Sequence, residues 1–204
     1  MPDCSCDFEP KNAVERKTLI AVLAINAVMF VVEFMAGWLA NSTGLIADSL
    51  DMLADASVYA ISLYALGRSA RIRGRIALAS GVALVLLGVG VLADVGRRFV
   101  AGSEPVGIVM ISVGALALAA NVLCLFLLAK HRHGSVNLRA SWVFSATDVI
   151  VNCGVIASGV LVWLTASRWS DLAIGLIITA VVIRGGIKII KDARGSLAEA
   201  PSGA

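Results

Sequence analysis

Long apolar segments alternate with short polar connections along almost the whole chain. Crossing a hydrocarbon core of about 30 Å takes about 20 mainly apolar residues in a helix. Six segments reach that length, at approximately 17–40, 44–67, 76–98, 105–129, 140–165 and 171–190. Lipid offers no partner to backbone polar groups, and the pattern lacks the short alternating strands of a barrel, so these segments are predicted to be helices. We therefore predict an all-α integral membrane protein with six transmembrane helices.

Polar segments flank this apolar region. Residues 1–16 mix both charges and lack the basic-then-apolar order of a signal peptide. Residues 191–204 are polar and short, and we expect a frayed end there rather than a domain. The predicted organisation is a cytoplasmic N-terminal tail (1–16), a six-helix transmembrane domain (17–190) and a short cytoplasmic C-terminal tail. The composition agrees, because 59% of the residues are hydrophobic against about 45–50% in soluble domains.

Lysine and arginine are distributed unequally between the two sides of the membrane. Thirteen fall on the side of both termini and three on the other side, namely Arg97, Arg98 and Arg168. Because positive charge accumulates on the cytoplasmic side, we place both termini in the cytoplasm. Arg184 lies inside the sixth segment, four residues before Lys188, and we expect its side chain to extend toward the cytoplasm.

Three aspartates interrupt the second apolar segment, in the sequence IADSLDMLADAS (46–57). Asp48, Asp51 and Asp55 are spaced by three and four residues, which puts them on one face of a helix. An aspartate at the centre of a membrane helix costs about 2.5–3.5 kcal/mol on insertion scales. Like charges at this spacing cannot all stay ionised without a counter-cation, and no lysine or arginine lies at their depth.

A fourth aspartate is predicted to reach the same depth from another helix. At about 1.5 Å per residue, Asp51 and Asp55 lie roughly 10–17 Å from the outer face, and Asp148 lies about 12 Å from the inner face. Asn152 follows Asp148 by one turn on the same face, and Asn26 falls at a similar depth in the first segment. Carboxylate and amide oxygens gathered near the midplane can hold a divalent cation.

The other acidic residues of the apolar segments receive different interpretations. We expect Glu33 and Asp94 to be protonated and bonded to a neighbouring helix, and Asp94 also lies close to Arg97 and Arg98. Asp48 is open between a role at the outer mouth of the site and a role in the fold, and a role other than ligation is favoured.

Several of these stretches match one known family. The stretches are DMLAD (51–55) in the second segment, NLRASWVFSATDVIVNCGV (137–155) in the fifth, INAVMFVVEFMAGWLANSTGLIADSLDMLAD in the first two, and DVGRRF at the end of the third. With the six-span layout, they resemble the cation diffusion facilitator family of metal/proton antiporters. The resemblance covers about 17–192. The paired acids alone are a weak signal, and their combination with NLRA and Asp148 is a strong one.

The resemblance implies a transport site with two ligands from the second helix and two from the fifth. Asp51 and Asp55 match the first pair, and Asp148 matches the aspartate of the fifth helix. The remaining position, usually His or Asp, falls on Phe144, which cannot coordinate a metal. Asn152 lies one turn after Asp148, whereas Phe144 lies one turn before it. We predict that Asn152 replaces the missing fourth ligand, with water as the alternative. A site of oxygen donors favours zinc less than one with His or thiolate ligands, so we expect weaker zinc specificity.

The family commonly has a C-terminal cytoplasmic domain, a ferredoxin-like metal sensor and dimer contact. Residues 191–204 are too few to form it, so we expect a membrane-only member. A homodimer would then have to form through helix packing. Four glycines of the third segment permit close approach, either between two copies or within one subunit: Gly81, Gly88, Gly90 and Gly96.

The predicted mechanism is an exchange of metal for protons. Empty aspartates in apolar surroundings hold protons, because burial disfavours their charged form. A divalent ion must displace those protons to bind. The resemblance implies alternating access and export from the cytoplasm. The predicted substrates are protons and divalent ions of the zinc, cadmium and cobalt class, in a lipid bilayer, without a prosthetic group and without nucleic acid.

Two peripheral pairs are open between metal capture and ordinary solvated segments. Cys4 and Cys6 make an incomplete thiolate site, and His131 and His133 lie in KHRHGS, whose own lysine and arginine repel cations. The solvated interpretation is favoured for both. Roles as small packing residues are expected for the remaining cysteines, Cys124 and Cys153.

Two alternatives to metal export stay open. An exporter of organic cations also needs a midplane carboxylate, but it would need aromatic walls, and the chain has only twelve aromatic residues. A non-transporting metal-binding or regulatory membrane protein would be consistent with Phe144 at the ligand position. An enzyme is not predicted, because the sequence contains no evident nucleophile–base pair or phosphate-binding loop.

Overall fold

The computed structural model describes residues 13–64, 69–129 and 136–199. These residues form α1 (Ala13–Leu39), α2 (Thr43–Tyr64), α3 (Ala70–Ala101), α4 (Gly107–Ala129), α5 (Val136–Thr165) and α6 (Trp169–Glu199). No strand occurs in the described ranges, so the prediction of an all-α protein with six helices is confirmed.

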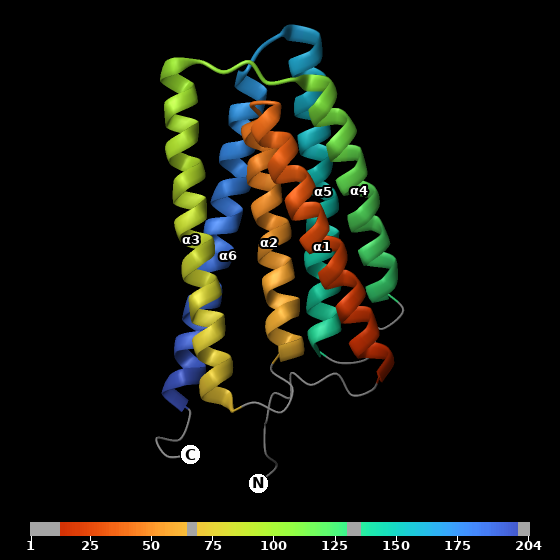
Figure 1. The fold of residues 1–204 in the computed structure, drawn as a ribbon, viewed down its shortest axis with the longest axis vertical. Coiled ribbons are helices and arrows are strands. Elements are labelled where there is room, and N and C mark those ends of the chain that lie inside the picture. The colour runs from red at the N-terminus through yellow and green to blue at the C-terminus, as the bar shows by residue number, and fades with distance from the viewer. Residues whose placement is uncertain (1–12, 65–68, 130–135, 200–204) are drawn as a thin grey trace.

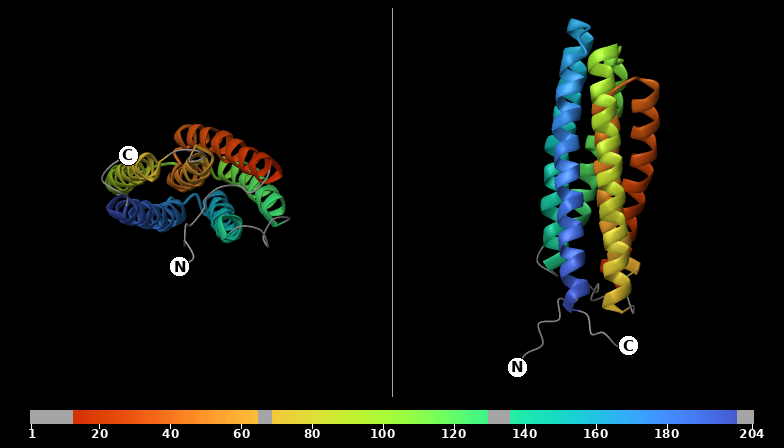
Figure 2. Two further views of the ribbon diagram at one scale, coloured as in Figure 1. Left: turned by 90° about the horizontal axis from the view of Figure 1, so that it is seen from below. Right: turned by 90° about the vertical axis from the view of Figure 1, so that its left-hand side faces the viewer.

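The helices run side by side in an up-and-down bundle (Figure 1). α1 begins and α6 ends at the same end, which we call the inner end because the charge distribution predicts that it faces the cytoplasm. The opposite end is the outer end. The most extensive packing joins α3 with α6, α4 with α5, and α1 with α2. Seen along the bundle, α3 and α6 stand together at one edge, and α4 and α5 lie toward the other (Figure 2).

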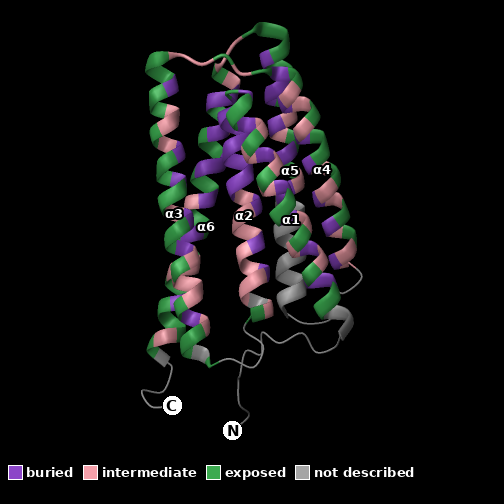
Figure 3. Ribbon diagram, viewed as in Figure 1, coloured by how far each residue is buried: buried purple, intermediate pink, exposed green. Residues whose placement is uncertain are grey.

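α2 is the central helix, because it contacts each of the other helices. Its burial changes along its length. Every residue from 42 to 50 is buried, whereas most residues from 51 to 61 are half-buried. Figure 3 shows this change as purple giving way to pink along α2. The outer half of the bundle is therefore packed more tightly around α2 than the inner half.

Among the described residues, five helices are long and apolar enough to cross a membrane, namely α1, α3, α4, α5 and α6. α2 is not among them, because it carries Asp48, Asp51 and Asp55. The sixth predicted span is thus an apolar helix with three acidic residues, and it packs against all five of the other helices. Its neighbours, rather than its own composition, make it compatible with lipid.

The predicted end of the last helix is wrong. The apolar segment ends near 190, but α6 continues to Glu199. The added turns pack against the start of α3. Ala193 is buried, and a Cβ added to Gly74 would lie 2.7 Å from Leu197 Cγ. Contact with α3 therefore replaces the frayed tail that the polar composition predicted.

The third helix is also longer than its apolar segment. It was predicted over 76–98 and extends from Ala70 to Ala101. The residues added at its start include three arginines, which are good helix formers and need no lipid-compatible surface at the inner end. Hydrophobicity predicted the part of α3 that can cross the bilayer. The helix propensity of the added residues extends the helix beyond that part.

The four glycines of α3 divide into two pairs. A Cβ added to Gly81 would lie 2.9 Å from Ile190, and one added to Gly88 would lie 2.6 Å from Ile183, both on α6. Gly90 and Gly96 would meet nothing within 4 Å. The first pair therefore serves packing within one subunit. A homodimer formed through transmembrane helices stays a prediction.

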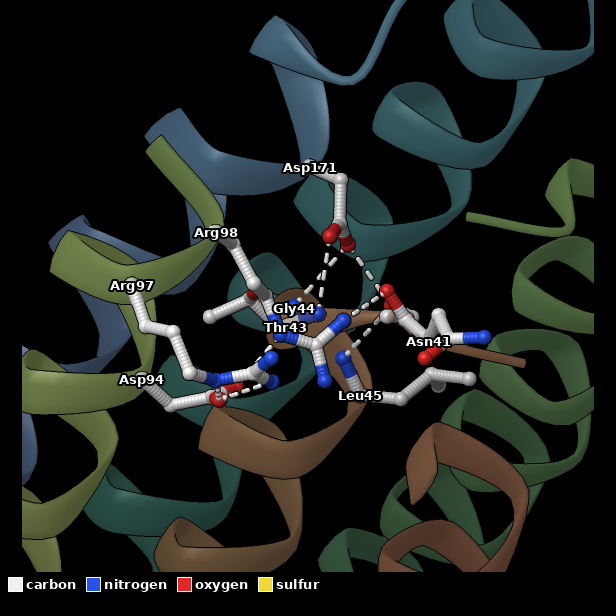
Figure 4. Close-up of polar contacts among 9 residues, drawn as sticks. Asn41, Thr43, Gly44, Leu45, Asp94, Arg97, Arg98 and Asp171 are labelled. Carbon is white, nitrogen blue, oxygen red and sulfur yellow. Dashed lines mark hydrogen bonds and ion pairs between the residues drawn. The ribbon is translucent and has the colours of Figure 1, made fainter. Parts of the chain in front are cut away.

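Asp171, at the start of α6, binds the N-terminus of α2 at the outer end (Figure 4). Its carboxylate accepts hydrogen bonds from Ser42 Oγ at 2.6 Å and from the amides of Thr43 at 2.7 Å and Gly44 at 3.0 Å. Ser42 Oγ accepts a hydrogen bond from the amide of Leu45 at 3.1 Å, as an N-cap residue does. The first amides of a helix lack partners within it, so Asp171 and Ser42 together satisfy them.

A second polar group at the outer end joins α3 to the turn between α1 and α2. Asp94 accepts hydrogen bonds from Arg97 at 2.6 and 2.9 Å and from Arg98 Nε. Arg98, which is buried, also donates to the backbone carbonyl of Asn41 (Figure 4). Asp94 thus lies beside both arginines as predicted. The expected bond from Asp94 to a neighbouring helix is wrong, because both partners belong to α3.

Candidate functional site

The side chains of Asp51, Asp55 and Asp148 lie together where α2 packs against α5. The carboxyl group of Asp148 lies within side-chain hydrogen-bonding reach of both Asp51 and Asp55. It is only 7% exposed, so it faces the interior of the bundle. α2 and α5 run in opposite directions, which brings the middle of one level with the middle of the other. The structure thus joins the three predicted aspartates, and their role as metal ligands stays a prediction.

Asp148 is the shared neighbour of the two carboxyl groups of α2, and Asp51 and Asp55 act on one another through their charges. Since an ionised carboxylate can only accept, a hydrogen bond between two carboxyl groups requires a proton on one of them. Asp55 also accepts a long hydrogen bond of 3.5 Å from the hydroxyl of Tyr59. No three of the described His, Cys, Asp and Glu side chains are arranged as a ready-made metal site. Metal binding therefore requires the aspartates to exchange hydrogen bonds for metal contacts.

Asn152 lies one turn outward from Asp148 on α5 and is fully buried. Its Nδ2 donates to the backbone carbonyl of Asp148 at 2.9 Å. Its Oδ1 has no hydrogen-bond partner in the described part of the chain. A buried amide oxygen without a partner is unusual, and it is chemically able to bind a cation. Asn152 as a metal ligand stays a prediction.

Cys124 of α4 belongs to the surroundings of the aspartates, although the sequence predicted only a packing role. It is fully buried, and Asp55 and Asp148 lie near enough for their charges to act on its thiol. Asn26 Nδ2 donates to Val22 O at 2.9 Å and to Cys124 Sγ at 3.8 Å. The signal that the prediction overlooked is Asn121, a polar residue three positions before Cys124 in an otherwise apolar helix. Residues at this spacing share one face of a helix.

Glu33 and Asp48 form a second acidic feature outward of the three aspartates. Both are buried, and neither carboxyl oxygen of either residue has a hydrogen-bond partner among the described residues. The expected hydrogen bond from Glu33 to a neighbouring helix is therefore wrong. Asp48 and Asp51 are near enough to Glu33 for their charges to act on it.

Several predicted features lie outside the described residues. Nothing is described of the Phe144 side chain, which matches the family's remaining ligand position. The same holds for the peripheral pairs, Cys4 with Cys6 and His131 with His133. Cys153 is described and exposed, so the packing role that we predicted for it is wrong.

A cavity of about 600 Å³ opens between α1, α2 and α3. Its lining includes Leu23 of α1, Ser57 and Tyr64 of α2, and Ser80 of α3. Ser57 follows Asp55 by two residues toward the inner end. The half-buried part of α2 therefore borders open space on the inner side of the aspartates.

A family model described as the cation efflux transmembrane domain matches residues 19–198. The chain belongs to the cation diffusion facilitator family of cation efflux proteins. The resemblance drawn from the second and fifth segments is thereby confirmed. With its five apolar helices, this family member is a multi-pass protein of the bacterial inner membrane. The family is one of transporters rather than of enzymes.

Three bacterial relatives illustrate the similarity of this cation diffusion facilitator to named transporters. The zinc transporter ZitB of Yersinia pseudotuberculosis is 24% identical over 196 residues, covering 90% of this chain and 63% of that protein. The cadmium, cobalt and zinc/H(+)-K(+) antiporter of Bacillus velezensis is 25% identical, with 91% and 63% covered. The metal cation efflux system protein CzcD of Cupriavidus metallidurans is 28% identical, with 80% and 55% covered. The chain thus spans less than two thirds of the length of these relatives.

Proposed function

We propose that this protein exports divalent metal cations of the zinc, cadmium and cobalt class from the cytoplasm in exchange for protons. Asp51, Asp55 and Asp148 bind the ion, and Asn152 supplies a further oxygen. The observation that carries the proposal is the position of the buried Asp148 beside both Asp51 and Asp55 inside a bundle of this family. The names of the relatives, which are zinc, cadmium and cobalt transporters, support the choice of ions.

Proton coupling follows from the chemistry of the aspartates. Carboxyl groups this close to one another can share a hydrogen bond only when one of them carries a proton. A divalent cation binds the ionised groups, so its arrival releases protons and its departure lets them return. The same oxygens therefore carry either a metal ion or protons. When the site faces the two sides alternately, this competition lets a proton gradient drive metal outward.

The packing of the bundle supports a state that is open toward the cytoplasm. The inner half of α2 borders the cavity lined by Ser57 and Ser80, whereas residues 42–50 are buried. At the outer end, Asp171 holds the start of α2 and Arg98 holds the preceding turn. In this state, metal enters from the inner side, and release outward requires the contacts at the outer end to separate.

The donor set indicates moderate selectivity. Carboxylate and amide oxygens bind many divalent ions, whereas thiolate and imidazole select zinc and cadmium. Cys124 is a described soft donor, and its thiol lies in the electrostatic field of Asp55 and Asp148. We expect transport of several divalent ions, with Cys124 favouring the softer ones.

Transport into everted membrane vesicles tests the proposal. Vesicles carrying the wild-type chain are expected to accumulate Zn²⁺, Cd²⁺ or Co²⁺ when the lumen is acidic, and to stop when the pH gradient is collapsed. Asp51→Ala, Asp55→Ala and Asp148→Ala are each expected to abolish uptake without loss of membrane insertion. Asp192→Asn, at an exposed position of α6, is the matched control. Wild-type uptake by any two of the three alanine variants would refute the site.

The same vesicles distinguish the alternatives. Metal binding without pH-dependent uptake would indicate a binding or regulatory protein. Uptake of a lipophilic organic cation in place of the metals would indicate a drug exporter. Either result would overturn the proposed function.

A further inference from the structure

Three fully buried side chains outward of the aspartate cluster carry oxygen atoms without partners. Glu33 of α1, Asp48 of α2 and Asn152 of α5 are each 1% exposed or less. Both carboxyl oxygens of Glu33, both of Asp48 and the amide oxygen of Asn152 lack a hydrogen-bond partner among the described residues. Buried polar atoms are nearly always paired, so a group of unpaired acceptors on three helices indicates a missing partner.

The packing of α1 on α2 brings Glu33 level with Asp48. A Cβ added to Gly37 would lie 2.9 Å from the backbone nitrogen of Ile46 and 3.0 Å from Leu45 Cβ, so the two helices cross closely at this point. They run in opposite directions, and one turn further inward along both leads to Glu33 and Asp48. The charge of Asp48 is also the nearest that acts on Glu33.

The packing of α5 on α2 brings Asn152 to the same depth. Asp148 lies within side-chain hydrogen-bonding reach of both Asp51 and Asp55. Because α5 runs opposite to α2, one turn outward from Asp148 corresponds to one turn outward from the middle of the Asp51–Asp55 pair, just inward of Asp48. The amide oxygen of Asn152 therefore lies between the aspartate cluster and the level of Glu33.

No described side chain donates a hydrogen bond to these oxygens. The hydroxyl of Ser49 donates to the carbonyl of Ile46 at 2.7 Å. The buried cation of the outer end, Arg98, donates to Asp94 and to the carbonyl of Asn41. Among the described side chains, these acceptors thus have neither a hydrogen bond nor an ion pair. Carboxylate and amide oxygens in such a group are ligands for a hard or borderline divalent cation.

We propose that Glu33 and Asp48 form a second cation-binding site, which takes a divalent metal ion on the outer side of the Asp51–Asp55–Asp148 cluster. Water completes the coordination, and Asn152 lies between the two sites. The choice of a divalent transition metal rests on the proposed function, whereas the existence of the site rests on the buried unpaired oxygens. The site lies between the aspartate cluster and the contacts that close the outer end, so an ion moving outward reaches it next.

The stoichiometry of Zn²⁺ binding tests this site. The full chain is purified in detergent in a Cys4→Ser/Cys6→Ser background, which removes the N-terminal thiols, and bound Zn²⁺ is measured by equilibrium dialysis. Glu33→Gln/Asp48→Asn is expected to lose one equivalent of Zn²⁺ relative to the background. Asp51→Asn/Asp55→Asn/Asp148→Asn is expected to retain one equivalent, and combining all five changes is expected to remove it. The exposed control Asp192→Asn is expected to bind as the background does.

Two results would overturn the second site. One is unchanged stoichiometry in Glu33→Gln/Asp48→Asn, which would mean that the pair holds only protons. The other is complete loss of Zn²⁺ in the triple asparagine variant. The amide substitutions preserve side-chain shape. If the double variant elutes as aggregate, the single variants Glu33→Gln and Asp48→Asn replace it, and each is expected to lose the same equivalent of Zn²⁺. If the background chain shows no pH-dependent uptake, the proposed function is overturned, but the second site is not.

Discussion

Asp171→Ala removes the acceptor that holds the N-terminus of α2 at the outer end. The carboxylate accepts hydrogen bonds from Ser42 Oγ and from the amides of Thr43 and Gly44. Asp171 and Thr43 are fully buried, so water cannot replace the lost acceptor. A buried donor left without a partner costs about 1–3 kcal/mol, and a lost helix cap costs about 1 kcal/mol. Because the three donors act as one unit, we expect a total loss of about 3–4 kcal/mol.

The free energy of unfolding in mixed micelles measures this loss. Unfolding is followed by tryptophan fluorescence as the mole fraction of SDS rises, and two of the reporters, Trp38 and Trp169, lie close to the outer end. Asp171→Asn keeps one acceptor oxygen and is expected to lose about 1–2 kcal/mol. Asp192→Ala, an exposed change on the same helix, is expected to stay within about 0.5 kcal/mol of wild type.

The result that would refute this reasoning is a small effect of the buried change. A loss below about 1 kcal/mol in Asp171→Ala would mean that the amides of α2 find other partners. An equal loss in Asp192→Ala would mean that removing any acid from α6 is destabilising, whatever its contacts.

Three further outcomes can be checked in the same preparations. Gly107→Ala would bring a Cβ within 2.6 Å of Gly159 O, so we expect a loss of about 1–3 kcal/mol, whereas Gly90→Ala, with nothing within 4 Å, is expected to lose none. Asn152→Ala is expected to change the ratio of Zn²⁺ to Co²⁺ uptake, and an unchanged ratio would remove it from the site. Cys124→Ser is expected to lower Cd²⁺ uptake relative to Co²⁺, because thiolates favour soft ions, and equal lowering of both would exclude a soft donor.

The sequence predicted those features that depend on one helix at a time. Apolar length gave the number of helices, and the spacing of Asp51 and Asp55 gave their common face. Depth arithmetic predicted that Asp148 comes level with them, because two antiparallel spans of one bilayer must share its midplane. The position of Asp148 beside both residues agrees with that arithmetic.

Features that depend on contacts between helices could not be predicted in this way. In the sequence, Asp171 is an ordinary acidic residue in the first turn of a helix. It can accept hydrogen bonds from the first amides of α2 only because α2 begins beside it. From the sequence, Glu33 was predicted to be a single protonated acid. Only the packing of the helices shows that it lies near Asp48 and that no hydrogen-bond donor contacts either carboxyl group among the described residues. The end of α6 was misplaced because Ala193 packs on α3, a contact that hydropathy does not record.

The acidity of α2 explains why this helix occupies the centre of the bundle. Three aspartates at about 2.5–3.5 kcal/mol each make its separate insertion unfavourable by about 7–10 kcal/mol. Contact with all five other helices removes α2 from lipid, and Asp148 then supplies a hydrogen-bonding partner that lipid lacks. Within this enclosure residues 42–50 are buried, whereas most residues from 51 to 61 are half-buried. The packing that makes the aspartates tolerable in a membrane thus also sets the unequal burial along α2, on which the proposed exchange of a metal ion for protons depends.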